Sequence, residues 1–251
     1  MRVTVLVTGL VLSLAACGDE KPAAGSASAA AASAKPSAAA PTSAKKPDGM
    51  PPVTVDEMGP FINGQRAVMK EAGGPEKLKK IVAELPINGK EVELAVLKKA
   101  KLSDVTAVVR ELGLAGAPTV KVKADSRGDL PKELVVTPQN KLAGAPAGCS
   151  VVAFITGKFE TDVWSISGGV AKKHVKGFAG PDLSNAGESL KKELKKCDSK
   201  QAFFTADDGL DWEIAHLAGG AIRVNDEDKK IESLVLLDEA PVPGRAVKLA
   251  Q

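Results

Sequence analysis

Apolar side chains recur at helix and strand spacing in the first part of the folded region. Residues 75–85 and 102–112 carry them at the period of a helix, which predicts two amphipathic helices. Gly113, Gly116 and Pro118 are expected to end the second helix. Asn63-Gly64 predicts a hairpin, because Asn-Gly is the favoured pair for a tight turn between strands. Strands are predicted at residues 53–55, 60–62, 92–96, 119–123 and 133–136.

The second part of the chain shows a similar order. Helices are predicted at residues 188–194 and 211–218, the latter closed by Gly219-Gly220. The turn-forming run Asn225 to Asp228 is interpreted as a hairpin turn between the last two strands. Strands are predicted at residues 150–155, 163–166, 202–205, 221–224 and 233–237.

The two orders of elements indicate an internal repeat. A chance alignment of two unrelated α+β segments is the alternative, and a duplication is favoured because the offsets between matched positions drift in one direction. Each module is expected to run β-α-β-α-β-β, an α+β fold with helices over one face of a sheet, at residues 51–140 and 141–251. Matched positions are Leu78 with Leu190, Val96 with Ala206, Leu102 with Leu210, Val120 with Ile222, and Leu134 with Leu234.

The N-terminus has the pattern of an exported lipoprotein. Arg2 precedes an apolar run at residues 3–14 that is too short to span a membrane but suits a signal peptide. Leu14-Ala15-Ala16-Cys17 resembles the bacterial lipobox, so residues 1–16 are interpreted as a signal and Cys17 as the lipidated residue. An ordinary secretory signal with a chance cysteine is the alternative. Lipid on Cys17 would anchor the chain to the inner or outer membrane, with its globular part in the periplasm or at the cell surface.

A low-complexity segment separates this anchor from the folded region. Residues 21–48 are almost wholly Ala, Ser, Pro, Gly, Thr and Lys, which offer no large apolar side chains to bury. Such a segment cannot offset the entropy lost on ordering. Residues 17–50 are therefore expected to form a disordered tether with a reach of about 30 Å.

Charge and aromatic content narrow the partners. The chain has 34 basic and 31 acidic residues and only 3% aromatics, so we expect no nucleic-acid binding, which requires a basic stripe and stacking rings. Lysine pairs such as Lys98-Lys99, Lys172-Lys173 and Lys191-Lys192 are interpreted as solvated faces. An anionic partner, such as phospholipid or cell-wall polymer, is the alternative for these lysines.

Cysteine count predicts one disulfide. With Cys17 lipidated, an exported chain is left with Cys149 and Cys197, whose pairing would add about 4 kcal/mol in the chain-entropy model. Two buried thiols are the alternative. A redox role is not expected, because the chain has no Cys-x-x-Cys pair.

No motif points to catalysis. Glu213 and His216 share a helical face as in di-iron helices, but such a site needs a second pair of this kind and further carboxylates. Asp207-Asp208-Gly209 with Asp211 lacks the spacing of a calcium loop and is better explained by helix capping from Asp208 or Asp211. His174 belongs to no motif. We therefore expect no catalytic residues, no metal and no cofactor.

The order of elements and several short motifs resemble the periplasmic domain of the ExbD/TolR biopolymer-transport proteins. That family carries a transmembrane helix with a functional aspartate, which this sequence does not match, so the resemblance implies only the extracytoplasmic half. It implies a non-catalytic domain that dimerises or engages an envelope protein or peptidoglycan. A small-ligand-binding lipoprotein or degenerate enzyme, with a pocket between the modules, is the alternative. The matching residues are Ile62-Asn63-Gly64-Gln65; Leu102-Ser103-Asp104-Val105 with Val108, Val109, Leu112, Ala115-Gly116 and Val120; and Thr205-Ala206-Asp207 with Leu210 and Trp212.

Overall fold

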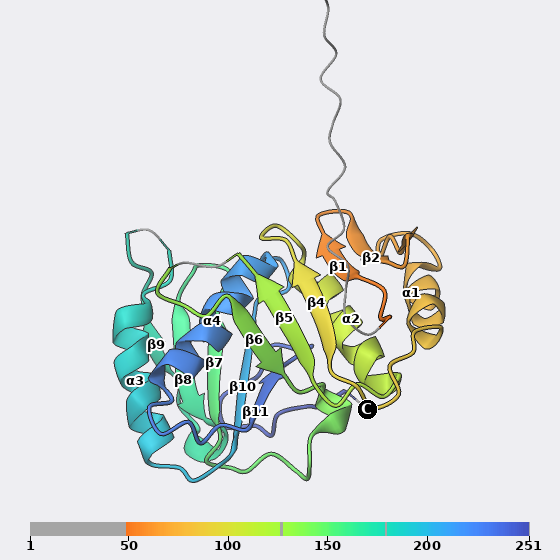
Figure 1. Cartoon of the computed structure of the whole chain (residues 1–251). Helices are drawn as coiled ribbons and strands as arrows, with labels where there is room; N and C mark the ends of the chain where they lie inside the picture. Colours follow the sequence, from red (N-terminus) through yellow and green to blue (C-terminus); the bar gives the residue numbers. More distant parts are fainter. Residues whose placement is uncertain (1–48, 126–127, 179, 251) are drawn as a thin grey trace, which may run out of the picture. The chain divides into compact units, whose positions relative to one another are not determined.

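A computed structural model describes residues 49–125, 128–178 and 180–250 of the chain (Figure 1). The predicted signal, Cys17 and the tether up to residue 48 lie outside the described residues. The described part forms one compact unit of helices and strands.

The first half of the fold is built around a six-stranded mixed sheet in the order β3-β2-β1-β4-β5-β6. Strands β1, β4 and β5 run parallel, with Val53 opposite Leu94 and Leu94 opposite Val122. The predicted turn at Asn63-Gly64 is confirmed: both residues have positive φ (48° and 76°) and join β2 to β3. The strands are β1 (Val53–Asp56), β2 (Gly59–Ile62), β3 (Gln65–Arg66), β4 (Val92–Val96), β5 (Val120–Ala124) and β6 (Glu133–Val136).

The second half contains a five-stranded mixed sheet in the order β11-β10-β7-β8-β9. Strands β7, β10 and β11 run parallel, with Ala153 opposite Phe204 and Phe204 opposite Leu236. The strands are β7 (Val151–Ile155), β8 (Thr161–Ser165), β9 (Lys172–His174), β10 (Gln201–Ala206) and β11 (Ser233–Leu236).

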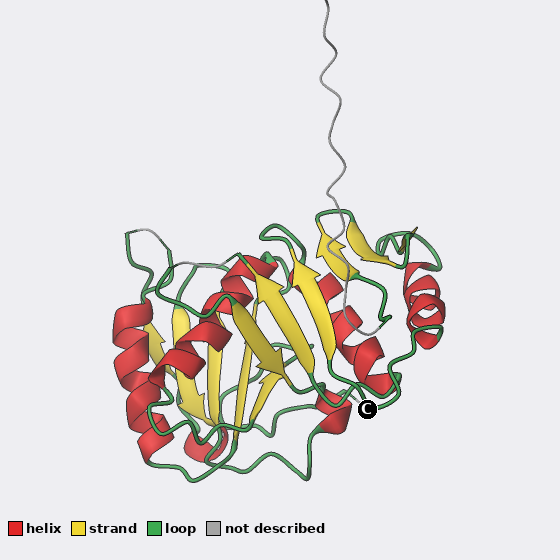
Figure 2. Cartoon of the chain, in the orientation of Figure 1, coloured by secondary structure: helices red, strands yellow, loops and turns green. Residues whose placement is uncertain are grey.

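Helices pack on both sheets, which confirms the predicted α+β class (Figure 2). The α-helices are α1 (Gly74–Ala83), α2 (Leu102–Leu114), α3 (Leu183–Lys195) and α4 (Trp212–Asn225), and short 3₁₀ turns lie at Gln139–Lys141 and Ile166–Gly168. A single apolar core between helices and sheets runs through both halves.

The faces of the two sheets that point away from the helices differ in character. On the first sheet this face is charged, and Lys121 lies 3.1 Å from Glu91 while Lys123 lies 2.9 Å from Glu93. On the second sheet it carries a separate apolar cluster that includes Val152, Phe154, Trp164, Ile166, Phe203, Val235 and Leu237. The C-terminal segment covers this cluster with Val247 and Leu249.

Helix α4 is longer than the sequence predicted. Residues 221–224 were expected to form a strand after a stop at Gly219-Gly220, but the helix continues through both glycines to Asn225. A Cβ at Gly219 would lie 2.9 Å from side-chain atoms of Leu134 and Phe204, so the glycine allows close packing and does not end the helix. The run from Asn225 to Asp228 consequently joins a helix to β11 and is not a hairpin turn.

This change also corrects how the two halves align. Strand β11 pairs in parallel with β10, as β5 does with β4, so β11 is the counterpart of β5 and not of β6. The predicted matches of Val120 with Ile222 and of Leu134 with Leu234 are therefore wrong. Strand β7, expected as an extra strand, is the counterpart of β1 because each lies between an antiparallel and a parallel neighbour. The halves thus read β-β-β-α-β-α-β, with β6 added to the first.

Candidate functional site

A groove follows the outer side of α4. The helix presents Ile214, Leu217, Ala221 and Val224 along it, a spacing that places them on one helical stripe. Two hollows of about 450 and 370 Å³ lie along this stripe and share Gly177, Gly180 and Pro181 from the segment before α3. We call these two hollows the α4 groove.

The larger hollow lies over the first half of α4. Phe159, Phe178 and Pro181 line it together with Ile214 and Leu217. Lys176 and Glu213 supply charge of both signs. An apolar lining with few charges suits the side chains of a partner more than a polar substrate.

The smaller hollow lies where the two halves of the fold meet. Leu130, from the hairpin before β6, packs against Gly220, whose added Cβ would lie 3.4 Å from the leucine side chain. Asp182, Ser184 and Asn225 bring polar groups from the start of α3 and the end of α4 to the same hollow. Residues of both halves therefore line the smaller hollow, which is the kind of pocket expected for the alternative of a small-ligand-binding protein.

The segment between β9 and α3 projects from the surface beside the groove. Its turn is closed by the backbone N–H of Gly177, which donates to the carbonyl of Gly180 at 2.7 Å. Phe178 at this turn has a relative accessibility of 111%, and Val175 has 72%. The α3 N-terminus that follows is capped by Asp182, whose carboxylate accepts from the N–H groups of Ser184 and Asn185. The hydrogen bond from the Asn185 side-chain amide, followed by these backbone bonds, holds the pKa of Asp182 below its usual range.

Glu213 and His216, which the sequence places on one helical face, do not lie in a common site. Glu213 lines the groove, whereas His216 is only 1% exposed. The His216 ring lies edge-on to Trp212 at 5.8 Å between ring centroids, and its Nε2 has no hydrogen-bond partner among the described residues. Burial lowers the pKa of His216 to about 4, so the imidazole is neutral in the folded protein at pH 7.

The acidic run before α4 serves local structure. A carboxylate oxygen of Asp207 accepts the backbone N–H of Gly157, which ties the end of β10 to the β7–β8 turn. Asp211 stands at the predicted N-cap position of α4, but its side chain makes no capping hydrogen bond. Within residues 49–125, 128–178 and 180–250, no three His, Cys, Asp or Glu side chains are grouped so that they could hold a metal ion.

The structure also brings together one pair that the sequence did not suggest. The His174 Nε2 and the Ser189 Oγ are 3.0 Å apart, joining β9 to α3. A nucleophilic serine needs a base that is itself oriented by a third group. Among the described residues, no carboxylate accepts a hydrogen bond from His174, so the third group of such a site is not seen here. The His174–Ser189 contact links β9 to α3.

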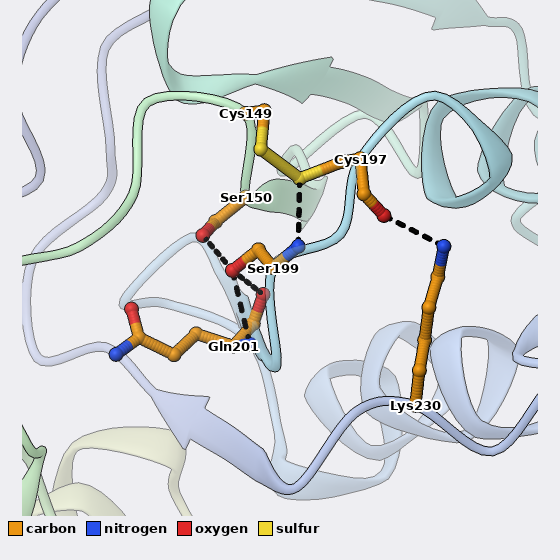
Figure 3. The surroundings of a disulfide bond; sticks show 6 residues. All are labelled: Cys149, Ser150, Cys197, Ser199, Gln201 and Lys230. Carbon is orange, nitrogen blue, oxygen red and sulfur yellow. Dashed lines mark hydrogen bonds between the residues drawn. A yellow bond between two sulfur atoms is a disulfide. The ribbon is translucent and has the colours of Figure 1, made fainter.

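The predicted disulfide is present between Cys149 and Cys197, whose Cα atoms are 5.5 Å apart (Figure 3). The bond links Cys149, which lies just before β7, to Cys197 in the loop after α3. The Ser150 and Ser199 hydroxyls lie 2.6 Å apart beside it, and Lys230 donates to the Cys197 carbonyl at 2.6 Å. Such a bond suggests an oxidising, extracytoplasmic location.

None of the helices in the described part of the chain combines the length and apolar character needed to cross a membrane. Comparison of the chain with protein-family models, with curated proteins and with solved structures finds no match.

Proposed function

We propose that this chain is a non-catalytic lipoprotein that binds a segment of an envelope protein in the α4 groove. Lipid on Cys17 anchors it to the inner or outer membrane, and the tether places the folded part in the periplasm or at the cell surface. The disulfide between Cys149 and Cys197 supports an oxidising compartment of this kind.

The apolar lining of the groove is the single observation that carries this proposal. Val224 is 52% exposed beside the smaller hollow, and Ile214 and Leu217 line the larger one. Exposed apolar side chains around a hollow are typical of interaction sites. A peptide segment with apolar side chains at helical or strand spacing would cover them.

The resemblance to ExbD/TolR proteins supports a role beside envelope transport machinery. Two of its motif residues, Leu102 and Trp212, start the second helices of the two halves. Asn63-Gly64 makes the hairpin turn expected of the family. We propose association with such a machine through the extracytoplasmic fold, without a share in proton transfer.

A small-ligand-binding protein is the second candidate. Asp182, Ser184 and Asn225 offer polar groups around the smaller hollow, with apolar contact from Leu130 and Ala221. A compact polar ligand would suit the side of this hollow where these polar groups gather, whereas the apolar stripe of α4 along both hollows favours a protein segment.

Site-specific photocrosslinking in intact cells tests the proposal. A benzophenone amino acid at Val224, 52% exposed, should capture a defined envelope protein. The same residue at Val242, 51% exposed and outside the groove, is the matched control and should not capture it. Capture of only peptidoglycan, no adduct from Val224, or equal adducts from both positions would overturn a protein-binding groove.

A further inference from the structure

The turn beside the α4 groove combines exposed apolar side chains with several lysines. Residues 172–181 contain three lysines and no acidic residue. Val175 and Phe178 are the exposed apolar residues of this stretch, at 72% and 111% relative accessibility. We call residues 173–178 the basic tip.

The lysines differ in how they are neutralised. Lys172 pairs with Glu193 of α3 at 2.5 Å and is therefore held against the fold. Lys173 lies opposite Asp162 of the neighbouring strand β8, and the two side chains attract each other electrostatically. In the part of the chain that the structure describes, neither Lys173 nor Lys176 forms a close ion pair. The tip thus keeps net positive charge next to Phe178.

The shape of the tip limits what it can contact. The Gly177 N–H donates to the Gly180 carbonyl, and Phe178 beside this bond has a relative accessibility of 111%. A protruding ring of this kind would need a matching pocket on a protein partner. The lipids of a bilayer surface can instead rearrange around the ring. Aromatic rings and lysines are the side chains that settle at the headgroup level of a bilayer.

We propose that the basic tip docks onto an anionic phospholipid surface, with Phe178 entering the interface and Lys173 and Lys176 facing the headgroups. The lipid anchor of the proposed function would keep the tip close to a bilayer, so even weak docking would be effective. Docked this way, the α4 groove would open beside the membrane surface, because Phe178 and Lys176 also line its larger hollow.

The charge component should be measurable as salt and lipid dependence. Each lysine near an anionic leaflet contributes about five-fold in affinity. Binding should therefore fall when salt is raised, since screening shortens the reach of the charges. It should also be weak on vesicles without anionic lipid.

Vesicle flotation of the chain from residue 17 onward, carrying Cys17→Ser in every arm, tests the tip without the lipid anchor. Binding to vesicles of equal parts phosphatidylglycerol and phosphatidylcholine should drop about five-fold or more in Phe178→Ser and in Lys173→Glu/Lys176→Glu. Leu97→Ser and Lys79→Glu/Lys80→Glu alter exposed residues elsewhere and should bind as the parent does.

The results separate this inference from the proposed function. Equal binding by the parent and Phe178→Ser, or no binding by the parent, would overturn membrane docking. Vesicle binding that depends on Phe178, with no protein captured at Val224, would overturn the groove proposal alone. Unchanged thermal unfolding of Phe178→Ser shows that the surface substitution leaves the fold intact.

Discussion

Lys101 and Asp211 lie opposite each other in an antiparallel bridge, and each is the residue directly before the second helix of its half. The bridge is held by hydrogen bonds from the Trp212 N–H to the Ala100 carbonyl at 2.7 Å and from the Leu102 N–H to the Leu210 carbonyl at 3.4 Å. Equivalent positions therefore meet each other, which is the geometry of a two-fold axis within one chain. This junction is used internally, so a second copy would have to bind elsewhere.

Two adjacent glycines in α4 should respond differently to alanine. Gly219→Ala places a Cβ 2.9 Å from Leu134 and Phe204, and the crowding should lower the free energy of unfolding by about 1–3 kcal/mol. Gly220→Ala meets Leu130 at an ordinary 3.4 Å and should gain up to about 1 kcal/mol from helix propensity. Urea unfolding of both variants measures the difference. Equal effects would contradict the assigned packing of α4.

The Cys149–Cys197 disulfide should contribute to stability. It joins residues 48 apart in the sequence, and removing it should lower the free energy of unfolding by about 4 kcal/mol. The double variant Cys149→Ser/Cys197→Ser, compared with the parent in denaturant, checks this. A loss below about 1 kcal/mol would mean that the unfolded chain gains little freedom when the bond is absent.

His216 should make stability fall in mild acid. Burial lowers its pKa to about 4 in the folded protein, while a histidine in the unfolded chain has a pKa near 6.5. Between these values the unfolded chain takes up a proton that the folded chain excludes. Stability is therefore full above about pH 6.5 and should decrease toward pH 4 by up to about 3 kcal/mol.

His216→Gln isolates this effect from the carboxyl groups. The variant keeps a neutral polar side chain, so its unfolding free energy should change less than the parent's between pH 6.5 and 4. Parallel stability curves for the two proteins across this interval would show that His216 is not the group responsible.

The C-terminal segment should be needed to cover the second sheet. Val247 and Leu249 pack on the apolar cluster, and the Ala250 N–H donates to the Gln139 side chain at 2.8 Å. Removing residues 242–251 should cost about 2–4 kcal/mol and increase binding of a hydrophobic dye. Val242→Ser changes an exposed residue of the same segment and should leave both readouts unchanged. Unaltered dye binding after truncation would refute the covering role.

The sequence predicted the elements whose pattern is local. The alternating Val92 to Val96 and the helical spacing after Leu102 are found as β4 and α2. Residues 221–224 were misassigned because two β-branched side chains and a preceding Gly-Gly favour a strand after a stop. These glycines let α4 pack closely against Leu130, Leu134 and Phe204, which are distant in the sequence.

The groove could not be predicted for a similar reason. Its lining comes from the β7–β8 turn, the hairpin before β6, the segment before α3 and the outer stripe of α4. None of these segments carries a motif that marks a binding site. Phe178 stands alone between glycines and lysines, so no periodicity marks it as part of a surface. The disulfide was predictable because only two cysteines remain once Cys17 is assigned to the anchor.

Metabolic labelling with an alkyne palmitate analogue tests most directly whether the chain is a lipid-anchored envelope protein. The parent should carry the label and sediment with membranes, whereas Cys17→Ala should be unlabelled and depleted from the membrane fraction, apart from any weak binding through the basic tip. A parent chain without label, or a Cys17→Ala variant labelled as strongly as the parent, would contradict the account.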